Sequence, residues 1–136
     1  MTNNTDSSAR GRILLAEDDD DVAMVASTML KSRGHEVVRV ATADDVLPAL
    51  IREQPDLLIL DVMMPSEENL DGFSLCATIK SKPTHRDLPV IIVSAIASGL
   101  GASAEKMREQ SGADVFLHKP YSMEELFGVV DRLLAG

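Results

Sequence analysis

Four short apolar runs, each followed by polar side chains, constrain the fold of this chain more than any other feature. They are Ile13–Ala16, Leu57–Leu60, Val90–Val93 and Val115–Leu117. Stretches with helical spacing separate the runs, and short apolar runs between helices are typical of buried parallel strands. The sequence therefore predicts an α/β fold in which helices cover both faces of a parallel sheet.

A further short strand is expected at Val37–Val40, which gives five strands alternating with five helices. Right-handed crossovers allow few strand orders, and 2-1-3-4-5 is the commonest for a sheet of this size. We therefore expect a doubly wound, flavodoxin-like, three-layer α/β/α fold with that order.

The helices are predicted from apolar spacing and from residues that start or stop helices. A fourth helix is expected at about Ala104–Ser111, after a Gly-rich loop at Ala97–Ser103. The first helix would end at Gly34 and carry, at helical spacing, Val22, Val25, Ala26, Met29 and Leu30.

Pro48 conflicts with the pattern of the second helix. Thr42 can cap that helix, with Asp44 and Asp45 in its first turn. Pro48 would then lie beyond the positions at which a helix tolerates proline. Either the helix starts later or it bends.

Length, charge and cysteine content narrow the class of protein. The 136 residues suffice for one domain, and we expect a disordered tail over residues 1–11 and a domain over residues 12–136. A net charge of −9 argues against direct binding of nucleic acid. Cys76, as the single cysteine, is most simply buried filler in a reducing, cytoplasmic setting. No apolar stretch reaches the ~20 residues that a membrane helix needs.

Polar groups follow the apolar runs at the points where the predicted strands end. In open α/β sheets, sites lie outside the carboxyl ends of the strands, so we expect these groups to share one crevice. They are Glu17 and Asp18, Asp61, Ser94 and Lys119.

Glu17 and Asp18 open a run of five acids that ends at Asp21. A nucleotide-binding sheet would carry glycines here, whereas acids repel a phosphate. Carboxylates crowded without a counterion are unfavourable, so the site favours a hard cation such as Mg²⁺. Asp19 to Asp21 have the simpler interpretation of a helix cap and first turn.

With a cation bound, Asp61 could attack a phosphoryl group and form an aspartyl phosphate. The cation and Lys119 would take the charge that develops on the equatorial oxygens, and Ser94 could hydrogen-bond a phosphoryl oxygen after transfer. Taken singly, Lys119 is a surface ammonium and Ser94 a loop cap. Their shared position at strand ends favours the chemical roles.

Over Arg12 to Leu134 the chain resembles the receiver domain of two-component response regulators, of the chemotaxis type with a single domain. Together the motifs that carry this resemblance are specific, although each alone would be weak. They are Ile13-Leu14-Leu15-Ala16-Glu17-Asp18-Asp19, Leu58-Ile59-Leu60-Asp61-Val62-Met63-Met64-Pro65, Val93-Ser94-Ala95, and Gly112-Ala113-Asp114 through Lys119-Pro120.

The resemblance implies that Glu17, Asp18, Asp61 and the Met63 carbonyl hold Mg²⁺, and that Asp61 is the phosphoacceptor. It implies a cis Lys119–Pro120 peptide and the switch residues Ser94 and Phe116; the less favoured alternative for Phe116 is an ordinary buried strand aromatic. The expected surface that switches is formed by the fourth helix, the fifth strand and the fifth helix.

The implied donor is a histidine kinase or phosphotransfer protein, and the implied target is a downstream protein or a missing output domain. The chain would be a monomer or a phosphorylation-dependent dimer, with no activity as an enzyme beyond its own phosphorylation and dephosphorylation. It could be a free-standing receiver or part of a larger regulator.

Two alternatives remain. An Mg²⁺-dependent aspartyl-phosphate hydrolase needs a second acid two residues after its nucleophile, where this chain has Met63. A pseudo-receiver, acting without phosphorylation, would lack part of the constellation. The chain departs from the family in a longer Ser66–Asp71 loop, in a longer span from Ser94 to Lys119, and in Glu17, where aspartate is commoner. Ile96 is predicted to restrict the water that hydrolyses the phosphoryl group.

Overall fold

The computed structural model describes residues 11–95 and 109–135, and these form a five-stranded parallel sheet. The strand order is β2-β1-β3-β4-β5, which confirms the predicted doubly wound topology. The strands are β1 (Arg12–Ala16), β2 (Glu36–Val40), β3 (Leu57–Asp61), β4 (Val90–Ser94) and β5 (Val115–His118).

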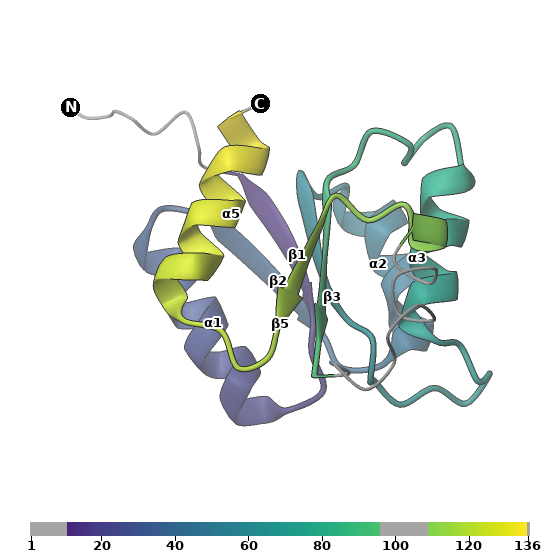
Figure 1. The fold of residues 1–136 in the computed structure, drawn as a ribbon, viewed down its shortest axis with the longest axis horizontal. Helices are drawn as coiled ribbons and strands as arrows, with labels where there is room; N and C mark the ends of the chain where they lie inside the picture. The colour runs from purple at the N-terminus through teal and green to yellow at the C-terminus, as the bar shows by residue number, and fades with distance from the viewer. Residues whose placement is uncertain (1–10, 96–108, 136) are drawn as a thin grey trace.

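Helices cover both faces of the sheet, with α1 and α5 on one face and α2 and α3 on the other (Figure 1). They are α1 (Asp20–Ser32), α2 (Val46–Glu53), α3 (Gly72–Ser81) and α5 (Met123–Ala135). Of the predicted fourth helix, only residues 109–111 are described, and they are helical. The predictions for the tail up to residue 10, for Ile96 and for the loop at residues 97–103 fall outside the described residues.

The three central strands, β1, β3 and β4, are buried on both faces, which explains why they are nearly continuous apolar runs. Side chains of a strand alternate between faces, so Leu14, Leu58 and Ile92 join the core beneath α2 and α3. Ile13, Ile59 and Ile91 join the core beneath α1 and α5.

The buried face of α1 agrees with the predicted one at Ala26 and Leu30 and differs from it at Val25 and Met29. Ala23, Ala26 and Leu30 are buried, whereas Val25 is 50% exposed and Met29 is 36% exposed. The small alanines allow the helix to lie close to the sheet, which turns the larger side chains toward solvent. Gly34, with a positive φ of 95°, follows the end of the helix as predicted.

The conflict at Pro48 is resolved by a late start of α2. A 3₁₀ turn, η2 (Ala43–Asp45), comes first and α2 begins at Val46. Pro48 therefore lies in the first helical turn, where a backbone N–H has no intrahelical partner. The prediction that Thr42 caps this helix is wrong, because Asp45 occupies the N-cap position of α2 and the Thr42 side chain makes no capping bond. Its hydroxyl donates instead to the Asp45 carboxylate at 3.0 Å.

Gly72 lets α3 start against the residue that follows β3. A Cβ at this position would lie 2.5 Å from the Val62 Cα, closer than real Cβ atoms approach a backbone. Asp71 caps the helix by accepting a hydrogen bond from the Ser74 N–H at 3.0 Å. The close approach sets the path of the chain immediately after Asp61.

Candidate functional site

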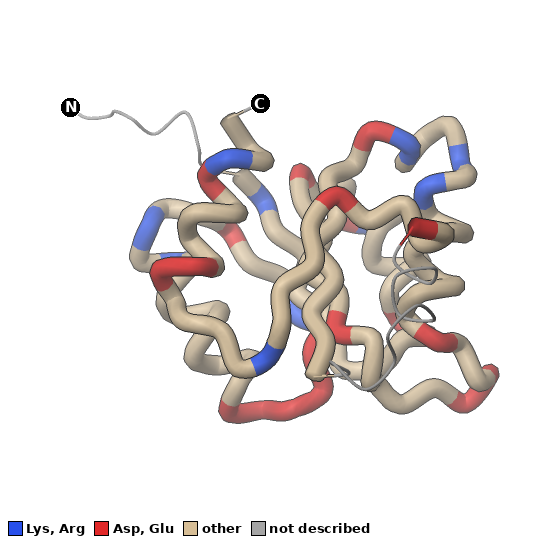
Figure 2. Tube along the Cα trace, viewed as in Figure 1, with Lys and Arg blue, Asp and Glu red and all other residues tan. Residues whose placement is uncertain are grey.

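The polar groups at the strand ends lie at one edge of the sheet. Glu17 follows β1, Asp61 ends β3 and Ser94 ends β4, and their exposed fractions are only 3%, 4% and 5%. The run of acids from Glu17 to Asp21 lies at this same edge, at the lower end of the sheet in Figure 2. The carboxyl ends of parallel strands thus place these three buried polar residues at one edge of the sheet.

Lys119, which follows β5, joins two of these groups. Its ammonium donates to the Asp61 Oδ2 at 2.6 Å and lies 3.1 Å from the Glu17 Oε1. Its backbone N–H donates to the Ser94 carbonyl at 2.9 Å. The structure therefore brings residues from four strand ends together, over a sequence separation of about a hundred residues between Glu17 and Lys119.

The second Asp61 oxygen is held by the chain that follows it. Oδ1 accepts a hydrogen bond from the Met63 N–H at 2.8 Å, and the Val62 N–H donates to the Val93 carbonyl at 3.2 Å. The Met63 side chain is 61% exposed and takes no part in this packing. The residues after β3 thus curl back over the carboxylate.

Glu17, Asp18 and Asp61 could hold a cation together. One carboxylate oxygen from each lies within 4.8 Å of the others. Asp18 is exposed, while the other two are buried. An all-oxygen set with an open, solvated side fits Mg²⁺, which takes carboxylate ligands and keeps several waters.

Burial and the contacts between Lys119 and the carboxylates shift the pKa values of the cluster in opposite directions. Burial raises the pKa of Glu17, and the bonds from the Asp19 N–H and from Lys119 only partly offset it. For Lys119, burial lowers the pKa, but the carboxylates of Asp61 and Glu17 outweigh burial and the net shift is upward. The ammonium is therefore charged at neutral pH, opposite two carboxylates.

The capping interpretation fits Asp19. Its Oδ1 accepts from the N–H groups of Asp21 at 2.9 Å and Val22 at 3.0 Å, and Asp20 and Asp21 lie in the first turn of α1. Asp19 is thus occupied by the helix, while Asp18 is turned toward Asp61 and Glu17.

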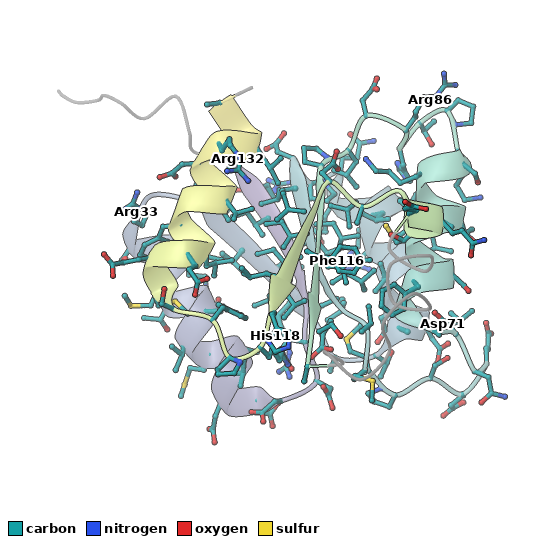
Figure 3. The ribbon with its side chains drawn as sticks, in the orientation of Figure 1. Arg33, Asp71, Arg86, Phe116, His118 and Arg132 are labelled. Atoms are coloured by element: carbon teal, nitrogen blue, oxygen red, sulfur yellow. The ribbon has the colours of Figure 1, made fainter. Side chains whose placement is uncertain are left out.

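Phe116 belongs to β5 (Figure 3), and its ring contacts a residue of α3. Its ring stacks on Phe73, with centroids 5.8 Å apart and an angle of 25° between the planes, and it packs against the core beneath α2 and α3. The Lys119–Pro120 peptide is cis, as the resemblance implied.

Two features of the site were missed by sequence reasoning. The longer loop after β3 is anchored by Asp44, which accepts from the Ser66 hydroxyl at 2.7 Å and the Glu67 N–H at 2.8 Å. These two bonds hold the pKa of the Asp44 carboxyl below its usual value. The other feature is Arg39, which donates to the Glu17 carbonyl at 2.9 Å. Its signal in the sequence is a charged residue among the valines of the expected strand Val37–Val40.

Known proteins are similar to this chain in sequence and in fold. The model of the response regulator receiver domain matches residues 13–131. The chain belongs to the response regulator receiver domain family. Receiver domains act in two-component phosphorelay signalling as acceptors of phosphoryl groups, and this is the class of function that the match assigns.

The transcriptional regulatory protein GltR of Pseudomonas aeruginosa is 38% identical over 128 residues, covering 93% of this chain and 50% of that protein. The chain spans about half the length of this curated relative. The receiver domain of a histidine kinase from Syntrophus aciditrophicus is 32% identical, with a TM-score of 0.83 over 93% of this chain and 91% of that one.

A third relative is relevant to the Mg²⁺ ion that the carboxylate cluster could hold. The receiver domain of a Pseudomonas aeruginosa sensor histidine kinase is 27% identical, with a TM-score of 0.78 over 93% of this chain and 98% of that one. That structure holds a magnesium ion in its active-site cleft.

Within the described residues of this chain, no helix is long and apolar enough to cross a membrane.

Proposed function

We propose that this receiver domain accepts a phosphoryl group on Asp61, in an Mg²⁺-dependent step, from a histidine kinase or phosphotransfer protein. One observation carries the proposal: the Lys119 ammonium contacts both Asp61 and Glu17, the two buried members of the carboxylate cluster, so a positive charge lies beside the proposed nucleophile.

Glu17, Asp18, Asp61 and the Met63 carbonyl would hold Mg²⁺. When bound, it neutralises the crowded carboxylates and stabilises negative charge on the phosphoryl oxygens. The family match and the magnesium ion in a relative of the same fold support this assignment.

In the reaction an Asp61 oxygen attacks phosphorus, while the bond from phosphorus to the donor's imidazole nitrogen breaks and its electron pair returns to the imidazole. Lys119 exchanges its contact with the carboxylate for one with the developing phosphoryl charge. The Met63 N–H keeps the carboxylate oriented for attack, because it fixes the other oxygen at 2.8 Å.

Phosphorylation would then be communicated through Ser94 and Phe116. The added charge of about −1.5 to −2 attracts the Ser94 hydroxyl, and Phe116 turns from its stack on Phe73 into the space that is vacated. The surface formed by the fourth helix, β5 and α5 would change its conformation and thereby its binding to a partner. That partner would be either a downstream protein or an output domain.

The hydrolase alternative is weaker because Met63 stands where such enzymes carry a second acid, and its side chain points largely into solvent. The pseudo-receiver alternative is weaker because the chain retains Glu17, Asp18, Asp61, Ser94 and Lys119.

Intact-mass measurement after incubation with a small phosphodonor tests the proposal. We expect one added phosphoryl group in the presence of Mg²⁺, none after chelation with EDTA, and none in Asp61→Asn. Continuous release of phosphate over many turnovers would instead support the hydrolase. An unchanged mass with a donor that phosphorylates a control receiver would refute the proposal.

A further inference from the structure

Arg39 holds the backbone of the acidic turn that follows β1. Its Nε donates to the Glu17 carbonyl at 2.9 Å and its Nη2 donates to the Asp18 carbonyl at 3.1 Å. The Nη2 also lies 2.9 Å from the Asp20 Oδ1. One guanidinium thus contacts three residues of the turn, Glu17, Asp18 and Asp20.

The position of Arg39 in β2 explains these contacts. β2 is at the edge of the sheet, and Arg39 pairs in register with Leu15 of β1, two residues before Glu17. Val38 and Val40 contribute to the core beneath α2 and α3. Because strand residues alternate between faces, Arg39 lies on the face of α1, whose first turn begins at Asp20.

The two carbonyls belong to Glu17 and Asp18, whose side chains are two of the three carboxylates in the cluster. The N–H of Glu17 is held as well, because it donates to the Val40 carbonyl at 3.1 Å. Five successive acids repel one another, so hydrogen bonds to the backbone are needed to hold the turn in one conformation. The planar guanidinium supplies two donors in a rigid fork, which an ammonium cannot do.

We propose that Arg39 is a positioning residue for cation binding: it fixes the backbone of Glu17 and Asp18 so that both carboxylates face Asp61. This inference rests on the proposed function, since it concerns the same Mg²⁺ site. Arg39 contacts two backbone carbonyls and the Asp20 carboxylate, and these contacts leave the carboxylates of the cluster to the cation.

A purely electrostatic role predicts the opposite result. Arg39 brings a positive charge near a site for a divalent cation, so its removal would tighten Mg²⁺ binding if charge alone mattered. Loss of a group that orients metal ligands typically weakens binding by 10–100-fold. Because Arg39 acts on the backbone and not on the ligand oxygens, we expect the lower end, about tenfold.

Isothermal titration with MgCl₂ separates the two roles. The variants are Arg39→Met, which removes the charge and the fork, and Arg39→Lys, which keeps the charge and removes the fork. Arg52→Met is the matched control, because Arg52 is 59% exposed, pairs with its neighbour Glu53 and carries the same charge. We expect Mg²⁺ binding about tenfold weaker in both Arg39 variants and unchanged in the control.

Wild-type or tighter binding in Arg39→Met would overturn the inference. Wild-type binding in Arg39→Lys would overturn it as well, because the two-donor fork would then not be needed. If the wild-type protein binds Mg²⁺ and the Arg39 variants match it, the inference fails while the proposed function stands. If the wild-type protein binds no Mg²⁺, the metal site itself is refuted, and the inference with it.

Thermal unfolding separates positioning from a general loss of stability. The melting temperature of each variant is measured in EDTA and at one subsaturating concentration of Mg²⁺. A variant that is only destabilised keeps the wild-type increment from Mg²⁺, which would contradict positioning. A variant with weakened binding shows a smaller increment, because stabilisation by a ligand depends on the ratio of its concentration to its Kd.

Discussion

Replacing Lys80 with methionine should destabilise the domain far more than an equal change of charge two residues away. The Lys80 ammonium donates to the Leu88 carbonyl at 2.6 Å and to the Asp114 Oδ2 at 2.9 Å, and its side chain is 15% exposed. The same Asp114 oxygen accepts the Val90 N–H at 2.8 Å. Lys80 therefore ties the end of α3 to the segments that lead into β4 and β5.

The magnitude follows from what Lys80→Met leaves behind. Hydrogen bonds to charged groups contribute about 1.5–3 kcal/mol, and removal of one partner of a fully buried ion pair costs about 3–5 kcal/mol. Asp114 is 38% exposed, so water compensates part of its loss. We expect a loss of about 2 kcal/mol in the free energy of unfolding, or roughly 6–10 °C in Tm for a domain of this size.

Urea and thermal unfolding followed by circular dichroism would measure this loss. Lys82→Met is the matched control, because Lys82 is exposed at the end of the same helix. Its removal should cost less than about 1 kcal/mol, the scale of a charge at a helix terminus. If the two variants unfold within 0.5 kcal/mol of each other (a margin of about the ordinary surface effect), the role assigned to Lys80 is wrong.

Three other predictions concern single residues. Gly128 is exposed in α5 and an added Cβ would meet no atom within 4 Å, so Gly128→Ala should raise the free energy of unfolding by about 0.5–1 kcal/mol; a lower stability in urea would contradict this. Burial raises the pKa of the Cys76 thiol to about 11, so alkylation by iodoacetamide at pH 8 should be slow until urea unfolds the protein, and rapid labelling of the folded protein would show the burial to be wrong. The Ser74 N–H lowers the pKa of Asp71, so the carboxylate stabilises the fold above its unfolded value of about 3.9 and loses that effect as pH falls through the folded value. Asp71→Ala should therefore cost about 1 kcal/mol at pH 7 and less below about pH 4, and an equal cost at both pH values in urea titrations would refute the cap.

The topology and the meeting of the strand-end groups could be predicted because both follow from rules that act along the whole chain. Parallel strands share their carboxyl ends, so polar residues after each apolar run had to lie at one edge of the sheet. That rule alone predicted that Asp61 and Lys119 are neighbours, although they are far apart in sequence.

Which face of a helix is buried, and which side chains meet across neighbouring strands, could not be predicted in this way. The sequence of α1 allows two overlapping apolar stripes that share Ala26 and Leu30, and close packing on the sheet buried Ala23 and left Val25 exposed. The reach of Arg39 to the turn after β1 depends on the register between β1 and β2, which no local pattern reveals. At Pro48, local rules left two alternatives, and the 3₁₀ turn before α2 selected the later start.

The central claim, that Asp61 is the acceptor within the cluster of Glu17, Asp18 and Lys119, is tested most directly by chemical trapping. Borohydride reduces an acyl phosphate of aspartate to homoserine, which peptide mass spectrometry can locate in the sequence. After treatment with a phosphodonor and Mg²⁺, the account predicts homoserine at position 61 and at no other acid. Reduction at Asp18 or elsewhere, or at no residue while a control receiver is labelled, would contradict it.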